Sequence, residues 1–258
     1  MEQKIGMTQK IGLVTGGSRG LGKSTALAMA AQGIDVILTY HSQKDSAEAV
    51  VAEIVAMGRK AVALQLDVAD ASHFKSFASQ VSQALKTYWQ TEHFDYLINN
   101  AGSGVYASFV DTTEAMFDQM VNIHLKSVFF LTQKLLPIIN NGGRIVNISS
   151  GLARFVIPGY MAYSAMKGGV EVLTRFMASE LGARNIAVNT VAPGAIETDF
   201  GGGLVRDNKN INAHIASQTA LGRVGVAGDI GPMIASLLSE NNRWINAQRI
   251  EVSGGMLI

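Results

Sequence analysis

The sequence predicts a single α/β domain with a doubly wound, seven-stranded parallel sheet and helices on both of its faces. Short β-branched runs alternate along the chain with longer segments in which apolar residues recur every three or four positions, the order expected of repeated strand–helix units. The predicted strands are apolar almost throughout, as expected of strands buried on both faces. No linker or change in composition divides the 258 residues, of which 48% are apolar, so we expect one core and one domain spanning residues 1–258.

The predicted elements follow one another in a regular rhythm. Strands are expected at residues 10–16, 35–40, 61–68, 94–102, 143–150, 185–194 and 249–255. Helices are expected at residues 20–33, 43–58, 71–89, about 113–137 and 159–181. Consecutive parallel strands are joined by right-handed crossovers. Segment 197–223, rich in Gly and Asn, breaks the rhythm after the sixth strand, and we expect it to be a mobile substrate lid. Residues 1–9 are expected to be a flexible N-terminal extension.

Composition and charge exclude several classes of function. The net charge is +1 and no block of like charge is present, which argues against a nucleic-acid-binding protein because such proteins carry a basic stripe. The chain has no cysteine and therefore no disulfide or thiolate metal site, and we expect no metal. The first residues lack the apolar core of a signal peptide, and no apolar run approaches the roughly 20 residues of a membrane span. We expect a cytoplasmic protein without a membrane partner.

A glycine-rich turn, Thr15–Gly22 with the sequence TGGSRGLG, follows the first strand and opens the first helix. Glycines allow positive φ and let a phosphate approach the main chain, while a helix N-terminus offers free N–H groups and a favourable dipole. In this strand–turn–helix setting the turn predicts a pyrophosphate site, whereas a glycine cluster alone would indicate only a tight turn. The residues expected to contact a cofactor here are Gly16, Ser18, Arg19, Gly20, Leu21 and Gly22.

The same turn also fits a second motif. Gly16–Gly20 matches G-x-S-x-G, the nucleophile elbow of α/β hydrolases, with Ser18 as the nucleophile. That elbow needs an oxyanion-hole loop from an earlier strand, and only about fifteen residues precede this turn. The position of the motif in the chain therefore argues against a hydrolase.

The end of the second strand indicates which dinucleotide would bind. A site for NAD places an acidic residue there, roughly 20 residues past the glycines, to hold the ribose 2′-hydroxyl. The residues at this place are Tyr40, His41 and Ser42, none of them acidic. Arg19 and Lys44 are basic residues close to them in the predicted fold, although Lys44 also fits a solvated charge at the start of a helix. We therefore predict NADP(H), with its 2′-phosphate near Arg19, His41 and Ser42.

A tyrosine and a lysine four residues apart, Tyr163 and Lys167, lie in a segment predicted to be a long helix. Positions i and i+4 share one helix face, so both side chains can reach one place. A lysine ammonium lowers the pKa of a nearby tyrosine, ordinarily about 10, and a tyrosine so tuned can protonate a carbonyl oxygen while hydride arrives at carbon. Tyr40 and Lys44 have the same spacing but are divided between a strand end and a helix start, so they share no helix face.

Polar residues elsewhere complete the predicted site. Ser150 ends the fifth strand, thirteen residues before Tyr163, and the carboxyl ends of parallel strands are where α/β sheets bind ligands. A hydroxyl there can hydrogen-bond a substrate oxygen, and Ser149 is the competing candidate. Asn122 stands in the otherwise apolar segment MVNIHL, where it is either a satisfied buried amide or part of the site.

Taken in order, these motifs resemble those of the short-chain dehydrogenase/reductase family over essentially the whole chain. The matching segments are TGGSRGLG (15–22), LDV with Asp67, NNAG (99–102), Asn122, NISS with Ser150, YSAMK (163–167) and PGAIET (193–198). The resemblance implies a Rossmann fold, with Tyr163 as general acid/base and Lys167 both lowering its pKa and holding the nicotinamide ribose. It also implies that Ser150, rather than Ser149, orients the carbonyl. Asn122 would fix a water molecule in a proton relay toward Lys167.

The resemblance implies the remaining contacts and the assembly as well. Further cofactor residues would be Asp67 and Val68 beside the adenine, Asn100, Ala101 and Gly102 along the adenosine side, and Pro193, Gly194, Ile196 and Thr198 at the nicotinamide end. Similar proteins are commonly homotetramers, so we expect a homotetramer, and the apolar end EVSGGMLI would suit an interface.

The motifs are most similar to those of β-ketoacyl-carrier-protein reductases, with one departure. Those reductases tend to be basic just before the fifth strand, where an acidic carrier docks, whereas residues 137–143 here carry no charge and leave Arg184 as one docking candidate. We expect a small-molecule ketone, aldehyde or secondary alcohol as substrate, with a β-ketoacyl thioester as the alternative. A non-catalytic NADP(H)-binding regulator is a third reading, against which the complete set of site residues argues. Candidate pocket residues are Ser103, Ala153, Phe155, Tyr160, Phe200 and the glycines 201–203.

Overall fold

The structure, a computed structural model, describes residues 9–258, and the predicted extension over residues 1–9 lies outside them except for Gln9. Seven strands form one sheet in the order β3-β2-β1-β4-β5-β6-β9, and every neighbouring pair runs parallel. From β1 the chain winds outward to β2 and β3, and then returns past β1 to β4 and the remaining strands. The predicted doubly wound fold with a seven-stranded parallel sheet is confirmed.

The strands of this sheet are short and largely buried. They span Ile11–Val14 (β1), Asp35–Tyr40 (β2), Ala61–Gln65 (β3), Phe94–Asn99 (β4), Ile139–Ile148 (β5), Ala187–Pro193 (β6) and Arg249–Val252 (β9). Successive side chains of a strand point to opposite faces, so Leu13 and Val14 belong to two different hydrophobic cores, one on each side of the sheet. Both side chains are completely buried, which explains why β1 shows no polar alternation.

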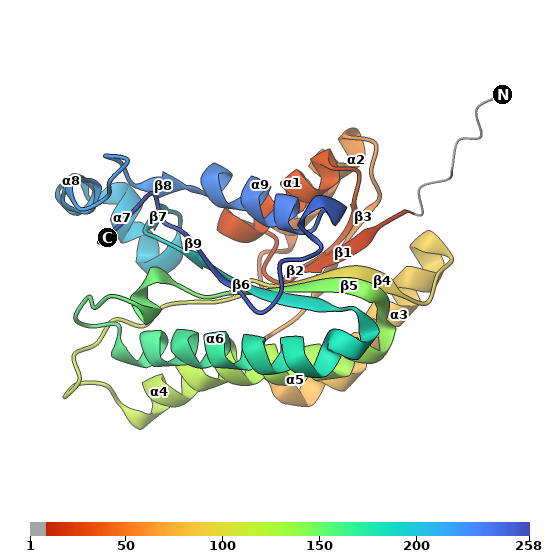
Figure 1. Cartoon of the computed structure of the whole chain (residues 1–258), viewed down its shortest axis with the longest axis horizontal. Coiled ribbons are helices and arrows are strands. Elements are labelled where there is room, and N and C mark those ends of the chain that lie inside the picture. Colours follow the sequence, from red (N-terminus) through yellow and green to blue (C-terminus); the bar gives the residue numbers. More distant parts are fainter. Residues whose placement is uncertain (1–8) are drawn as a thin grey trace.

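Helices cover both faces of the sheet, as Figure 1 shows. On one face lie α1 (Gly20–Ala31), α2 (Lys44–Ala56) and α9 (Ala227–Leu237); on the other lie α3 (Phe74–Ala84), α4 (Glu114–Met120), α5 (Ser127–Leu135) and α6 (Met161–Leu181). α1 and α9 touch closely, because a side chain at Gly231 of α9 would overlap the backbone of Ser24 in α1. Packing of these helices buries both apolar faces of the sheet. The carboxyl ends of the strands are left as the place where a site can form.

Helix α9 and strand β5 differ from the sequence-based expectation. α9 was not predicted, because its segment contains glycines and Pro232, residues that disfavour a helix interior. Its packing against α1 outweighs this weak local propensity. β5 begins at Ile139, earlier than predicted, and a register shift opposite Phe94–Tyr96 accommodates the added residues.

A π-helical turn, Val121–Lys126, joins α4 to α5 within the predicted helical segment 113–137. Such a turn inserts one residue into the helical ladder and changes the direction in which side chains point, and it is frequent at functional sites. Asn122 and His124 both lie in this turn. Their side chains therefore cannot be placed by assuming an uninterrupted helix.

Segment 197–223 is more regular than its composition suggested. It contains α7 (Leu204–Asp207) and α8 (Lys209–Ser217), which lie beyond one end of the sheet (Figure 1). β7 (Ile196–Glu197) pairs with β8 (Gly225–Val226), so the two ends of this segment lie side by side. The glycines 201–203 all have positive φ, from 60° to 78°, a region that residues with a side chain rarely adopt. The role of this segment as a lid stays a prediction.

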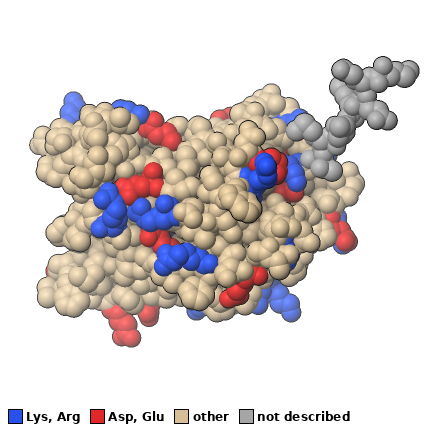
Figure 2. All heavy atoms as spheres, viewed as in Figure 1, with Lys and Arg blue, Asp and Glu red and all other residues tan. Residues whose placement is uncertain are grey.

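The surface carries few charges on the face shown in Figure 2. Lys and Arg lie there in small groups beside Asp and Glu, and most of that face is uncharged. This face therefore has no basic stripe of the kind that binds nucleic acid. Within residues 9–258, every helix is too short or too polar to cross a lipid bilayer.

Candidate functional site

The glycine turn between β1 and α1 forms an open backbone cradle. Gly16 and Gly20 have φ of 67° and 55°, and a Cβ added to Gly22 would lie 2.1 Å from the carbonyl oxygen of Gly16. Arg19 caps α1 in an extended conformation without a side-chain hydrogen bond to the first turn, which also contains no acidic residue. The N-terminal N–H groups of α1 are thus not neutralised by a local carboxylate, and they suit an anion such as a pyrophosphate.

The predicted adenosine-side residues are hydrogen-bonded to this turn. The amide Nδ2 of Asn100 donates to the carbonyl oxygen of Thr15 at 2.8 Å and to that of Gly16 at 3.2 Å. The backbone N–H groups of Asn100 and Ala101 both donate to the Thr15 hydroxyl at 2.9 Å. The end of β4 and the glycine turn therefore form one rigid unit.

The opposite side of the turn meets the start of segment 197–223. The methyl group of Thr198 lies 3.6 Å from the position of a Cβ on Gly20, so the two predicted cofactor residues are neighbours. The guanidinium of Arg19 pairs with the carboxylate of Asp199 at 3.4 Å, and Arg206 of α7 binds the same carboxylate. Arg19 is thus linked to the predicted lid.

At the carboxyl end of β2 the structure places Tyr40 as the last strand residue and Lys44 as the first residue of α2. The two side chains share no helix. His41 and Ser42 are exposed between them, and the His41 ring lies 3.6 Å from the carboxylate of Asp67. Val68 follows at a half-buried position against the core beneath. No acidic residue stands at 40–42, where a 2′-hydroxyl would be held.

Tyr163 and Lys167 are both buried on the inner face of α6. The Lys167 Nζ lies 5.4 Å from the centroid of the Tyr163 ring and donates a hydrogen bond of 2.7 Å to the carbonyl oxygen of Ile148 in β5. Burial lowers the pKa of Lys167 to about 7. Burial also raises the pKa of Tyr163 above its usual value, while a hydrogen bond with Ser150 acts in the opposite direction. Burial, and not the lysine, thus dominates the tyrosine pKa and favours the protonated phenol.

The neighbouring serines have different partners. Ser150 lies near enough to Tyr163 to lower its pKa, and its hydroxyl accepts a hydrogen bond of 3.2 Å from the backbone N–H of Leu152. Ser149 is buried and donates to the carboxylate of Glu171 at 2.7 Å. The structure therefore places Ser150, and not Ser149, beside the tyrosine.

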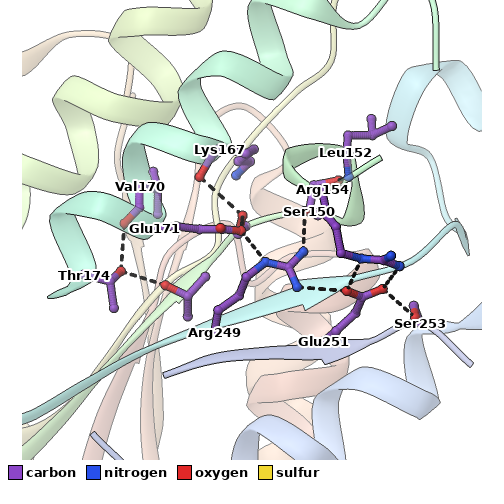
Figure 3. Close-up of polar contacts among 12 residues, drawn as sticks. Ser150, Leu152, Arg154, Lys167, Val170, Glu171, Thr174, Arg249, Glu251 and Ser253 are labelled. Atoms are coloured by element: carbon purple, nitrogen blue, oxygen red, sulfur yellow. Dashed lines mark hydrogen bonds and ion pairs between the residues drawn. The ribbon is translucent and has the colours of Figure 1, made fainter. Parts of the chain in front are cut away.

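A chain of charged groups lies behind these serines, as Figure 3 shows. Arg249 of β9 binds the Glu171 carboxylate at 2.7 Å and the Glu251 carboxylate at 2.8 Å. Arg154 binds Glu251 at 2.8 Å and also donates to the carbonyl oxygens of Met256 and Leu257. The network thus connects the Ser149–Ser150 corner to the C-terminal segment. This network could not be predicted from the sequence, because its members are far apart in the chain and show no shared pattern.

The two polar residues of the π-helical turn are placed differently. His124 is buried, its ring lies edge-on to the Tyr163 ring with centroids 5.0 Å apart, and its Nε2 lies 2.6 Å from the carbonyl oxygen of Ser103. Asn122 is half-buried, and within residues 9–258 its side chain makes no hydrogen bond. The structure brings His124, which the sequence analysis did not select, against the tyrosine. The only sequence signal was a second polar residue in MVNIHL.

Further aromatic side chains lie near the tyrosine. The Phe200 ring lies 5.4 Å from that of Tyr163 and packs against Gly104, where any side chain would overlap it. Tyr160 stands edge-on to Tyr106 at 5.3 Å, and its hydroxyl lies near Gly201. The predicted pocket residues Ala153 and Phe155 follow Ser150 in the chain. The Phe155 ring packs against Gly151 and against a small apolar cluster formed by Ile215, Val224 and Met256. Phe200 therefore brings an aromatic ring from segment 197–223 against Tyr163.

The predicted nicotinamide wall continues from the end of β6. Pro193 pairs with Val252 of β9, and the N–H of Gly194 donates to the carbonyl oxygen of Val252 at 3.1 Å. Ile196 packs on the core that contains α1 and α9. Gly102 lies on the facing side, where a Cβ would come within 2.7 Å of the His124 ring. The structure thus gathers the predicted glycine turn, strand ends and YSAMK residues along one edge of the sheet.

Comparisons with known proteins agree with this arrangement. A family model described as enoyl-(acyl carrier protein) reductase matches residues 16–257. Tetrahydroxynaphthalene reductase PfmaG of Pestalotiopsis fici is 34% identical over 95% of this chain and 91% of its own length. The 3-oxoacyl-[acyl-carrier-protein] reductase FabG of Staphylococcus aureus is 38% identical over 96% of this chain and 98% of its own.

Solved structures give the same result. The angucycline C-6 ketoreductase LanV, crystallised with bound NADP, superposes with a TM-score of 0.91 at 31% identity, covering 96% of this chain and 95% of its own. Family model, relatives and structure each extend over nearly the whole chain. Together with the motifs at the sheet edge, they establish that the chain belongs to the short-chain dehydrogenase/reductase family.

Proposed function

We propose that this protein is an NADP(H)-dependent oxidoreductase that interconverts a carbonyl compound and the corresponding secondary alcohol. The observation that carries the proposal is the buried Tyr163 phenol, which lies near Ser150 and Lys167 at the end of the sheet that also bears the glycine turn. A protonated phenol in this place is a general acid ready to act on a substrate oxygen. In the reverse reaction, the deprotonated Tyr163 is the general base.

The residues present fit a dinucleotide phosphate. The turn has glycine at positions 16, 17, 20 and 22, where the backbone is open to a pyrophosphate, and α1 begins in it at Gly20. When bound, NADPH supplies the hydride. The residues that would hold it are those of the turn with Asp67, Val68, Asn100, Ala101 and Gly102 on the adenosine side, and Tyr163, Lys167, Pro193, Gly194, Ile196 and Thr198 toward the nicotinamide.

The preference for the phosphorylated cofactor rests on the end of β2. Tyr40, His41 and Ser42 offer no carboxylate to a ribose 2′-hydroxyl, whereas His41 and Ser42 are exposed and Arg19 is nearby at the glycine turn. The NADP bound by the similar LanV enzyme supports this preference. A 2′-phosphate would accept hydrogen bonds from these groups.

In the reduction, the Tyr163 hydroxyl donates its proton to the substrate carbonyl oxygen. Ser150 holds the same oxygen and, through its hydrogen bond, counteracts the effect of burial on the tyrosine pKa. Lys167 is positioned by its hydrogen bond to the Ile148 carbonyl oxygen. Its ammonium group stabilises the negative charge of the phenolate that forms on Tyr163. Burial of Tyr163 and Lys167 excludes bulk water from these two groups and strengthens the interactions between their charges.

The border of the site favours a substrate with a large flat apolar part. The Phe200 ring lies 5.4 Å from that of Tyr163, and Tyr160 packs edge-on against Tyr106, whose side chain is 71% exposed. Offset or edge-on contacts with another aromatic ring are favourable in such a setting. The similarity to tetrahydroxynaphthalene and angucycline reductases supports an aromatic or polycyclic ketone.

A β-ketoacyl thioester on a carrier protein is the second candidate, favoured by the 38% identity to FabG. The predicted docking residue Arg184 is already engaged, since it donates to Asn141 and to the carbonyl oxygens of Leu136 and Ile139. A carrier would therefore have to bind elsewhere, and the free ketone is preferred.

The assembly and location stay predictions. A homotetramer is supported by exposed apolar side chains on α5 and α6, namely Phe129, Phe130, Val172 and Phe176. Light scattering on the purified protein tests the tetramer, and cell fractionation tests the cytoplasmic location.

The deciding experiment is an NADPH-oxidation screen over naphthol-type and polycyclic ketones, aliphatic ketones, aldehydes, β-ketoesters and acyl thioesters. We expect turnover with the aromatic ketones and a higher kcat/KM with NADPH than with NADH. Tyr163→Phe should bind NADPH as the wild type does and lose nearly all turnover. Substantial residual activity in that variant would remove Tyr163 from the role of acid, and a best substrate among the acyl thioesters would favour the second candidate.

A further inference from the structure

Arg249 lies on β9, the strand at one edge of the sheet, and its side chain points to the face that α6 covers. Its neighbours Ile250 and Val252 pack on the core that contains α1 and α9, so Arg249 and Glu251 lie on the opposite face of the strand. The Arg249 side chain is only 24% exposed. A charged group so far removed from water is stable only where its donors have partners.

The guanidinium group of Arg249 binds three separate segments of the chain. Its Nε donates to the Glu171 carboxylate of α6 at 2.7 Å, and its Nη1 donates to the carboxylate of Glu251 at 2.8 Å. Its Nη2 donates to the carbonyl oxygen of Ser150, which follows β5, at 3.4 Å, the longest of the three bonds. Figure 3 shows the guanidinium group between these three residues. Because the group is planar, it fixes the positions of its partners relative to one another.

Two of these segments carry proposed catalytic groups. Glu171 lies four residues after Lys167 and eight after Tyr163, and therefore on the same side of α6 as both. Ser150 holds the substrate oxygen in the proposed function, and it lies near enough to Tyr163 to lower the pKa of the phenol. Arg249 therefore connects the helix that carries the acid directly to the backbone of the serine.

Two further hydrogen bonds at Ser150 are local. Its carbonyl oxygen also accepts from the N–H of Ala153 at 3.1 Å, and its hydroxyl accepts from the N–H of Leu152 at 3.2 Å. Such bonds shape the loop after β5 but do not set its distance from α6. Ser149 also reaches α6 through Glu171, at 2.7 Å, but its loss would leave the bonds of Arg249 to Glu171 and Ser150 in place.

We propose that Arg249 is a positioning residue, which fixes the distance between Ser150 and Tyr163 by binding α6 at Glu171 and the Ser150 carbonyl oxygen with one planar group. The inference rests on the proposed function and adds to it a residue from the edge of the sheet. Glu251 supports the guanidinium group from its third side and is itself bound by Arg154 at 2.8 Å.

Arg249→Met and Glu251→Gln separate positioning from stability. Arg249→Met removes the bonds from β9 to Glu171 and Ser150, and a displacement of Ser150 by about 1 Å should lower kcat by about 100-fold. Glu251→Gln is the matched control in the same strand. It weakens the network but leaves both of those bonds, so kcat should stay within about threefold of the wild type. Both variants should lower the Tm, and both should keep the Kd for NADPH within about twofold.

Two more variants test the geometry of the group. Arg249→Lys keeps the charge and can pair with Glu171, but an ammonium group cannot also span to Ser150 in a fixed plane, so kcat should fall by about tenfold. The double variant Glu171→Gln with Arg249→Met removes the unpaired carboxylate and should have a higher Tm than Arg249→Met without regaining kcat. This double variant tests the inference even where Arg249→Met alone does not fold.

A spectroscopic measurement does not depend on turnover. In tyrosine-labelled protein without cofactor, the ¹³Cζ chemical shift of Tyr163, assigned by its loss in Tyr163→Phe, reports the surroundings of the phenol oxygen. Arg249→Met should move this signal in the same direction as Ser150→Ala does, and Glu251→Gln should leave it at the wild-type position. If the wild type reduces no carbonyl compound, the proposed function fails while this signal still tests whether Arg249 holds Ser150 near Tyr163.

Three results would overturn the inference. The first is an equal loss of kcat in Arg249→Met and Glu251→Gln, which would assign the loss to stability alone. The second is full activity in the double variant Glu171→Gln with Arg249→Met. The third is a Tyr163 signal that is the same in the wild type and in Arg249→Met.

Discussion

Ser149 and Ser150 are adjacent in the chain just after β5, yet their hydroxyls lie on opposite sides of the backbone and contact different residues. Ser150 has an extended backbone, with φ of −157° and ψ of 153°, and side chains alternate along such a backbone. Ser149 consequently turns toward Glu171 in the charged network, at 2.7 Å, and Ser150 toward Tyr163. The pair therefore offers an internal comparison between a residue placed for stability and one placed for chemistry.

Ser150→Ala should lower kcat by about 100-fold with little change in the Kd for NADPH, because the tyrosine loses its hydrogen bond and the substrate oxygen loses a donor. Ser149→Ala is the matched control. It should keep most of the activity and instead lower the Tm, since it leaves a buried Glu171 oxygen with one partner fewer. Steady-state kinetics and thermal unfolding of both variants test the prediction, and equal kinetic losses in the two would contradict it.

The pKa of Lys167 predicts a pH-dependent difference in stability. The group titrates near pH 7 in the folded protein and at its ordinary value of 10.5 when unfolded. Between these values the unfolded chain binds more protons, so the stability of the wild type rises with pH through this window. Lys167→Met removes the titration, and its Tm relative to the wild type should therefore be highest at or below pH 7 and decline toward pH 10.

Tm measurements without cofactor from pH 6 to pH 10 test this relation. Lys126→Met, at an exposed lysine in the π-helical turn, is the control and should run parallel to the wild type over the whole range. A constant Tm difference between Lys167→Met and the wild type would show that the lysine is not shifted by burial.

The parallel strands and the YSAMK helix could be predicted because their signals are local. β2 was predicted at its observed bounds, since Asp35–Tyr40 is a single apolar run between turn residues. The glycine turn was recognisable because glycine is required wherever a phosphate must approach the backbone. These features depend on residues that are close in the sequence.

Other features depend on contacts that a sequence pattern does not show. α9 contains Pro232 and is held by its packing on α1, so its local propensity gives the wrong answer. The placement of Asn122 and His124 depends on a π-helical turn, which no periodicity predicts. The tyrosine pKa was expected to fall because of Lys167, but burial, which a sequence does not reveal, dominates it.

The ion pair between Arg19 and Asp199 predicts competition for the cofactor phosphate. Both partners are exposed to solvent, so the pair is weak, and a 2′-phosphate would compete with Asp199 for the guanidinium. Asp199→Asn should tighten the binding of NADPH by about two- to fivefold and leave that of NADH unchanged. Arg19→Ala should weaken NADPH selectively. Fluorescence titrations of both cofactors check the prediction, and a parallel change for NADH and NADPH would contradict it.

The position of Phe200 over Tyr163 predicts an effect on substrate size. Phe200→Ala should raise KM for aromatic ketones by about tenfold or more, because an aromatic contact beside the carbonyl is lost, and should affect small aliphatic ketones little. Leu204→Ala, at a similarly exposed apolar residue in α7, is the control and should leave both substrate groups unchanged. An equal rise in KM for aromatic and aliphatic ketones would argue against a contact with the ring.

Glu251 links the two arginines behind the active site and predicts an acid-sensitive contribution to stability. Burial raises the pKa of its carboxyl group, but hydrogen bonds from Arg154, Arg249 and Ser253 outweigh this effect and lower the pKa to about 2. Because the value in the unfolded chain is 4.5, the carboxylate stabilises the fold above that pH, and the contribution is lost as the pH falls toward 2.

Glu251→Gln should therefore lower the Tm by about 2–8 °C at pH 7, since it leaves two arginines without their shared anion, and the difference should shrink below pH 4.5. Glu53→Gln is the control, because its partner Lys23 is a surface residue and such pairs contribute little. Since Arg154 also holds the carbonyl oxygens of Met256 and Leu257, hydrogen exchange in the C-terminal segment should increase in Glu251→Gln but not in the control. A Tm difference that is independent of pH would show that the lost stability comes from packing and not from the charge of Glu251.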